Sequence, residues 1–244
     1  MRTSIGFAFV LVTALAACKG GDTGTGGGGG DDTTMPDAAV LQPPTRGFQI
    51  VSPEITITAG QEITYCYYFK TPNTDLMVIK KWESHMEPGS HHMILFTTPT
   101  EVQPAGTISS TTCGIGGSSA QNIPAWMYGA QTADATLALP ADDGAGKPLG
   151  QEIPPGTPAY IQMHYVNSQD VDIKVHVTVN AEAYDVGAAY TKTAPYITFN
   201  PNITIGPGAT GVVISQTCST PANTKFWEMS THSHKQSVKT EVKA

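Results

Sequence analysis

The stretch Val171-Asp172-Ile173-Lys174-Val175-His176-Val177-Thr178-Val179 alternates strictly, because every odd-numbered residue is aliphatic and every even-numbered residue is polar. A period of two places alternate side chains on opposite faces of a β-strand, so this stretch predicts a half-buried antiparallel strand. Other stretches with strand character lie on both sides of it; they are residues 54–58, 61–69, 76–80, 93–97, 160–166, 203–205 and 211–216. Pro, Gly and Asn separate these stretches, and no window shows an apolar stripe of helical period. We therefore expect an all-β fold built from antiparallel β-sandwiches or jelly rolls.

The composition agrees with short strands joined by turns and argues against one class of partner. Of the 244 residues, 25 are Gly and 18 are Pro, whereas only 14% are charged. The formal net charge is −7, and a protein that binds nucleic acid instead needs a concentrated basic patch. We therefore expect no nucleic-acid partner.

The N-terminus has the features of a bacterial lipoprotein. Residues 1–17 predict a signal peptide, with a basic start, a short apolar core and small residues before Cys18, the order found in a lipobox. The alternative is an ordinary cleaved signal followed by a chance cysteine. We expect lipidation at Cys18, with the lipid as the only membrane contact, and a location in the cell envelope. Lys19 favours the outer membrane, by resemblance to the sorting rule of double-membraned bacteria.

A segment rich in Gly and Asp follows the signal peptide. Residues 18–46 contain an unbroken run of five glycines at residues 26–30, flanked by acidic and Thr side chains. Such a segment has too little apolar surface to offset the entropy lost on ordering. It predicts a disordered tether.

Among the seven histidines, three precede residue 165 in contexts that suit a metal site. His91 and His92 are adjacent at a strand start, so on a regular strand their rings would point to opposite faces. They can share an ion only if the backbone bends, which the preceding Pro88-Gly89 makes possible. His164 shares a strand face with Gln162. Taken singly, an adjacent pair is usually only surface, and a lone strand histidine is more often a hydrogen-bonded polar group than a ligand.

The remaining histidines differ in what their spacing allows. His232 and His234 are two residues apart, which places both rings on one face of a strand, close enough to hold one ion. The same spacing is common by chance. His176 lies on the polar face of its strand, and His85 lies in a polar loop, so we interpret both as structural or solvated.

The order of these motifs along the chain is more specific than any of them alone. His-His-Met at residues 91–93, Gln-Met-His-Tyr at 162–165 and His-Ser-His at 232–234 follow one another. This order resembles the copper type II, ascorbate-dependent monooxygenases, the family of peptidylglycine alpha-hydroxylating and dopamine beta-monooxygenases. Ala125-Trp126 and Leu139-Pro140 also fit the family pattern. The similarity covers roughly residues 50–244.

The resemblance implies two consecutive antiparallel β-sandwich domains of jelly-roll type. Here they would span residues 47–184 and residues 185–244, the second being incomplete. In the first domain of the family three histidines hold a copper that stores an electron, and the matching residues are His91, His92 and His164. Gln162 matches a family position beside that copper.

The resemblance also implies a second copper site, a reaction and a disulfide. His232 and His234 match the histidines that, with a methionine, hold the copper that binds dioxygen. The implied reaction is hydroxylation of a C–H bond in a small-molecule substrate, with dioxygen and an ascorbate-type reductant. Cys66 and Cys113 match a family disulfide of the first domain, a bond that export favours.

The chain departs from the family pattern at three points. No methionine follows His234, Cys218 lacks its family partner, and Ser230 stands where the peptidylglycine branch has a substrate-binding arginine. We therefore expect a truncated second domain, little oxygenase activity from these 244 residues, and a substrate other than a peptide with C-terminal glycine. One alternative is a copper-binding or electron-transfer surface lipoprotein without oxygenase activity. Another is a surface lipoprotein whose histidines bind no metal, and zinc would also accept three histidines.

Overall fold

The computed structural model describes residues 41–113, 123–198, 200, 202–229, 231 and 237–243. Within these residues the chain forms strands and no helix, which confirms the all-β prediction. The strands are β1 (Gly47–Val51), β2 (Ile55–Ile57), β3 (Glu62–Lys70), β4 (Met77–Met86), β5 (Ser90–Thr97), β6 (Ile108–Ser109), β7 (Ala125–Ala130), β8 (Asp134–Ala138), β9 (Leu149–Ile153), β10 (Pro158–Val166), β11 (Ile173–Val175), β12 (Val177–Ala183) and β13 (Thr191–Thr193).

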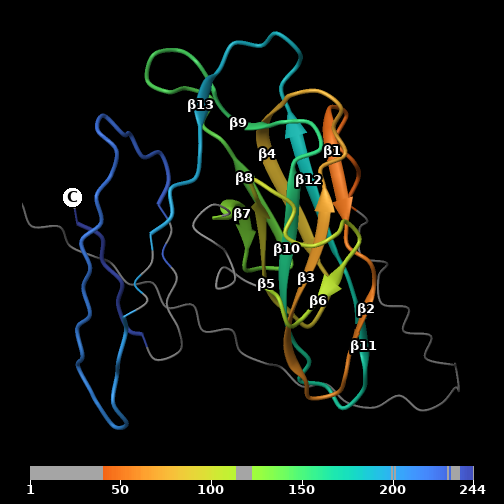
Figure 1. The fold of residues 1–244 in the computed structure, drawn as a ribbon, viewed down its shortest axis with the longest axis vertical. Coiled ribbons are helices and arrows are strands. Elements are labelled where there is room, and N and C mark those ends of the chain that lie inside the picture. The colour runs from red at the N-terminus through yellow and green to blue at the C-terminus, as the bar shows by residue number, and fades with distance from the viewer. Residues whose placement is uncertain are drawn as a thin grey trace, which may run out of the picture. The chain divides into compact units, whose positions relative to one another are not determined.

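Most of these strands belong to two large sheets (Figure 1). The first has the order β1-β12-β4-β9-β13, and β8 also pairs with β4. The second has the order β6-β3-β10-β5-β7, while β2 and β11 form a separate two-stranded sheet. Among the described strands, β13 and β9 pair in parallel and the other pairs are antiparallel.

The two large sheets share one apolar core. Trp82 of β4 stacks on Tyr128 of β7, with ring centroids 6.0 Å apart, so the two sheets meet at this pair. Ile161 of β10 and Val179 of β12 belong to the same buried cluster. Full burial of one such aliphatic side chain contributes roughly 1.5–3 kcal/mol to the free energy of unfolding. Because the odd-numbered side chains of β10 face this core, its even-numbered side chains lie on the opposite face of the second sheet.

That opposite face carries a smaller apolar cluster next to a disulfide. Tyr160 of β10 stacks on Phe96 of β5 with ring centroids 4.9 Å apart, and Tyr68 of β3 lies 5.2 Å from the Tyr160 ring. Cys66, which is fully buried in this cluster, is bonded to Cys113. The disulfide implied by the resemblance is therefore present. It ties the segment that follows β6 to strand β3 of the second sheet.

The alternating stretch at residues 171–179 forms two strands where one was predicted. Val175 ends β11 and pairs with Ile55, whereas Val177 begins β12 and pairs with Met86 in the first large sheet. His176 lies at the break between them, and its carbonyl oxygen accepts a hydrogen bond from the backbone of Glu87. Alternation reports which face of the strand is buried, but it does not report that the strand changes partners.

The strands predicted at residues 203–205 and 211–216 are wrong, since the described residues after β13 contain no strand. Ile203, Ile205 and Val213 are all more than half exposed. A strand persists only where a partner strand completes its ladder, and a short local alternation supplies none. The described residues from Leu41 onward belong to one compact unit. The domain boundary after residue 184, with an incomplete sandwich beyond it, stays a prediction.

The signal peptide, Cys18 and residues 19–40 lie outside the described residues, but the last part of the expected tether does not. The backbone carbonyl of Leu41 accepts a hydrogen bond from Gln49, and that of Gln42 accepts one from Asn180. Two side-chain amides of the first sheet therefore hold the backbone at Leu41 and Gln42, and the disorder expected of residues 18–40 stays a prediction. In the part of the chain that is described, no helix is long and apolar enough to cross a lipid bilayer.

Candidate metal centre

The pairing of β5 with β10 brings two of the predicted ligands together. In this antiparallel pair His92 lies directly opposite His164, one step beyond the pair Met93 and Met163. Directly opposed residues on one face of a sheet have Cβ atoms about 4.5–5.5 Å apart, close enough for both rings to reach one ion. Both rings lie on the face of the sheet that points away from the main core.

His91 joins them because the strand is bulged at that residue. His164 is opposite His92, but the next residue, Tyr165, is opposite Ser90, so His91 is an extra residue without a partner on β10. A bulge of this kind kinks the strand and redirects the extra side chain. Adjacent histidines on a strand can share an ion only if the backbone bends between them, and the bulge supplies this bend.

The turn before the bulge is fixed by close packing and hydrogen bonds. Gly89 has φ = +91°, in the left-handed region that favours glycine, and a Cβ atom there would also push the Cδ1 end of the Ile173 side chain aside. The backbone N–H and the hydroxyl of Ser90 both donate to the carbonyl oxygen of Glu87, at 3.2 and 2.7 Å. These contacts determine where the chain enters β5 and hence where His91 lies.

The three rings form a tight triangle. Their centroids are 5.3 Å apart for His91 and His92, 5.1 Å for His91 and His164, and 4.9 Å for His92 and His164. One ring nitrogen from each lies within 4.8 Å of the other two. Metal–imidazole bonds are about 2.0–2.1 Å long, so small ring rotations would allow all three nitrogens to contact one ion.

The triangle is open to solvent on one side. His91 is exposed, while His92 and His164 are partly buried. Three protein ligands with an accessible fourth position are typical of exchangeable or catalytic metal sites, whereas structural sites are closed by four protein ligands. The donor set therefore suits an ion that binds a further small molecule.

Two more residues are placed beside the triangle. Oε1 of Glu62, at the start of β3, lies 3.0 Å from Nε2 of His164. Gln162 shares the face of β10 with His164 and is aligned with Cys66 on one side and Ile94 on the other. Its predicted role beside a copper stays a prediction. Sequence reasoning missed Glu62, because its position relative to His164 depends on the register between β3 and β10.

Of the other histidines, His85 and His176 are among the described residues. His232 and His234, with Ser230, lie outside the described residues, so the second copper site stays a prediction. The prediction that His85 lies in a loop is wrong. His85 lies on β4, and its Nδ1 is 2.8 Å from Oδ1 of Asp134.

His176 and Cys218 complete the residues that the sequence singled out. His176 has Nδ1 3.6 Å from a carboxylate oxygen of Glu87. His85 and His176 thus each have an acidic partner, consistent with the structural role expected of them. Cys218 is an exposed free thiol.

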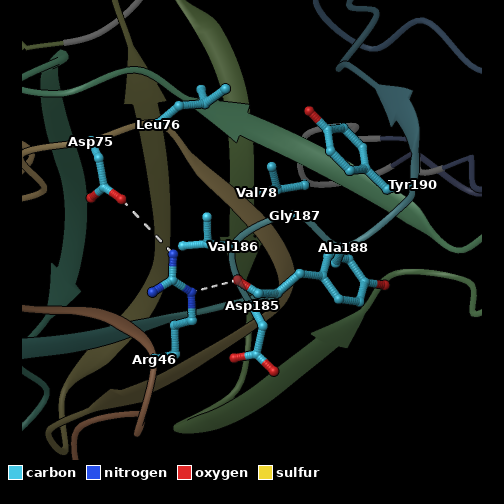
Figure 2. A pocket seen from close by; sticks show the side chains of 10 residues that line it. Arg46, Asp75, Leu76, Val78, Asp185, Val186, Gly187, Ala188 and Tyr190 are labelled. Carbon is cyan, nitrogen blue, oxygen red and sulfur yellow. Dashed lines mark hydrogen bonds and ion pairs between the residues drawn. The ribbon is translucent and has the colours of Figure 1, made fainter.

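A hollow of about 350 Å³ lies away from the triangle, where the start of β4 meets the loop that follows β12 (Figure 2). The guanidinium of Arg46 donates through Nε to the carbonyl oxygen of Tyr184 at 2.6 Å, and its Nη2 lies 3.9 Å from Asp75. Arg46 is thus partly satisfied by the protein itself. The hollow shares no residue with the histidine triangle.

Compared with protein-family models and with curated protein sequences, the chain matches none.

Proposed function

We propose that the chain is a copper protein in which His91, His92 and His164 hold a copper ion. The observation that carries the proposal is their convergence from two neighbouring strands through a bulge at His91. Three imidazoles are neutral donors, and they suit a copper that changes between its two common oxidation states. Copper also binds nitrogen sites more tightly than the other divalent first-row metals.

The activity we propose is hydroxylation of a C–H bond in a small-molecule substrate, with dioxygen and an ascorbate-type reductant. When bound, copper would supply one-electron redox chemistry. The chain's own contribution is to hold the three imidazoles on the neighbouring strands β5 and β10 and to leave one side of them open to solvent through His91. The reaction itself rests on the family resemblance, since His232 and His234 lie outside the described residues.

The alternative function is copper binding or electron transfer without oxygenase chemistry. What favours it is that one centre with three histidines is sufficient to take up and release one electron. Under either function, we propose lipid anchoring through Cys18 in a bacterial cell envelope, with the outer membrane as its location.

A titration with Cu(I) and Cu(II) tests the metal centre. We expect a single high-affinity ion per chain, and we expect His91→Ala to lose it. His85→Ala is the matched control, because this histidine lies on β4 of the first sheet and pairs with Asp134. A saturating ligand at a hundredfold excess over its Kd raises the free energy of unfolding by about 2.7 kcal/mol, so thermal unfolding with copper gives a second measurement. Equal stoichiometry in wild type and His91→Ala would reject the site.

Oxygen consumption with ascorbate tests the oxygenase. Consumption that depends on copper and disappears in His91→Ala supports it. Because the sequence predicts little oxygenase activity from these 244 residues, loss of the Cu(II) EPR signal without oxygen consumption shows only that the bound ion accepts an electron from ascorbate. Zinc bound in preference to copper at equal free concentrations would reject both proposed functions.

A further inference from the structure

Glu62 reaches the histidine triangle from a third strand, β3. In the pairing of β3 with β10, Thr64 lies opposite His164 and Glu62 lies opposite Val166. Glu62 and His164 are therefore diagonal neighbours on one face of the sheet. Such neighbours are separated by about 7–8 Å at the backbone, a gap that a glutamate side chain can span.

The contact itself is a hydrogen bond between Oε1 of Glu62 and Nε2 of His164, 3.0 Å long. The side chain of His164 is 17% exposed, whereas that of Glu62 is 66% exposed. The imidazole is thus held by its surroundings, and the carboxylate approaches it from the solvent side.

The chemistry of this bond decides which nitrogen of His164 is available to a metal. An ionised carboxylate only accepts hydrogen bonds, so the proton must be on Nε2. In a neutral imidazole the lone pair is then on Nδ1, and only a nitrogen with a lone pair can bind a metal ion. Carboxylates that accept a proton from the distal nitrogen of a ligand histidine fix its tautomer and its orientation in known metal sites.

We propose that Glu62 is a positioning residue, which holds His164 in the Nε2–H tautomer and presents Nδ1 to the ion. The effect on metal affinity rests on the proposed function, but the effect on the tautomer does not. Glu62→Gln is the informative change, because an amide keeps the length of the side chain and can either accept from Nε2–H or donate to a bare Nε2. The variant thus removes the preference for the Nε2–H tautomer of His164 and keeps a hydrogen bond to its Nε2.

The first experiment measures the tautomer in metal-free protein. Long-range ¹H–¹⁵N correlation spectra of ¹⁵N-histidine-labelled protein, recorded at a pH at which histidine is neutral, distinguish the two tautomers. We expect His164 to be the Nε2–H form in wild type and a mixture in Glu62→Gln. Glu54→Gln is the matched control, since Glu54 is an exposed glutamate that pairs with Lys174. The same tautomer distribution in wild type and Glu62→Gln would overturn the proposal, whether or not metal binds.

The second experiment measures affinity for Cu(II) by competition with a chelator. We expect Glu62→Gln and Glu62→Ala to weaken binding by roughly 10–100-fold, as is usual for the loss of a carboxylate partner of a ligand histidine, and Glu54→Gln to have no effect. Because Glu62 is exposed, the midpoint of chemical unfolding of the metal-free protein should not change. If Glu62→Gln changes the tautomer of His164 but the wild-type protein binds no copper, the role of Glu62 is supported and the proposed function is rejected. Weaker binding with an unchanged tautomer would overturn the proposal in favour of Glu62 as a direct ligand.

Discussion

Removal of the disulfide by Cys66→Ala with Cys113→Ala should lower the free energy of unfolding by about 4 kcal/mol. The two cysteines are separated by 47 residues. The entropy that a cross-link removes from the unfolded chain is about 2.1 cal/mol/K plus 1.5R times the logarithm of the loop length. For this loop the sum is roughly 13.6 cal/mol/K, which gives about 4 kcal/mol at 25 °C.

The packing around Cys66 makes alanine the right replacement. Cys66 is fully buried against Tyr68, Phe96 and Tyr160, so a serine would add the cost of an unsatisfied hydroxyl. Alanine leaves the site apolar, and most of the measured loss then comes from the bond. A domain of about 200 residues loses roughly 2–4 °C in Tm per kcal/mol, so the expected shift is about 8–16 °C.

Guanidinium unfolding of the variant and the wild type measures the difference directly. Cys218→Ala should be present in both proteins, because this exposed free thiol could exchange with the disulfide. Cys218→Ala alone should leave stability unchanged. A loss below about 1 kcal/mol in the double variant would show that the unfolded chain is already restricted, and the entropy argument would fail.

Three further predictions concern the first sheet and its core. Gly47→Ala should lower the free energy of unfolding by more than about 2 kcal/mol in a urea titration, because φ is +129° there and a Cβ would lie 1.8 Å from the carbonyl oxygen of Ala181. Trp82→Phe should cost about 2–4 kcal/mol by the same titration, because it removes the indole N–H that donates to the buried Oε1 of Gln151 and leaves a cavity. Glu182→Gln should destabilise at pH 7 by at most about 1 kcal/mol, since hydrogen bonds, first from Lys81, lower the pKa of the Glu182 carboxyl. A lowered folded-state pKa gives Glu182 a stabilising effect that is complete above the ordinary value of 4.5. This effect is lost as the pH falls through the folded-state pKa, so the urea midpoints of variant and wild type should converge below that pKa.

The all-β class and most strands were predictable because alternation is a local property of the sequence. Residues 61–69 and 160–166, predicted as strands, agree with β3 and β10 to within a few residues. The break at His176 was not predictable, since it arises where the chain leaves one partner strand for another. The strands predicted at residues 203–205 and 211–216 do not form for a similar reason, because strand pairing depends on residues far away in the sequence.

The candidate site was predictable in its members and only partly in its geometry. The resemblance to the copper monooxygenases selected His91, His92 and His164. The alternation of side chains along a strand showed that His91 and His92 could bind one ion only if the backbone bends there. Which residue forms the bulge, and that Glu62 lies diagonal to His164, follow from the registers of β5 and β3 with β10. Register is set by the packing of whole strands, so no local signal reports it.

The bulge is also what the burial of the surrounding residues demands, with or without a metal. Met93 and Leu95 face the main core, so in a regular β5 the alternation would direct His91 into that core as well. An imidazole buried there without a hydrogen-bond partner would cost roughly 1–3 kcal/mol. The bulge instead leaves His91 exposed on the face that carries His92 and His164. The same backbone irregularity therefore avoids a buried polar group and assembles the triangle.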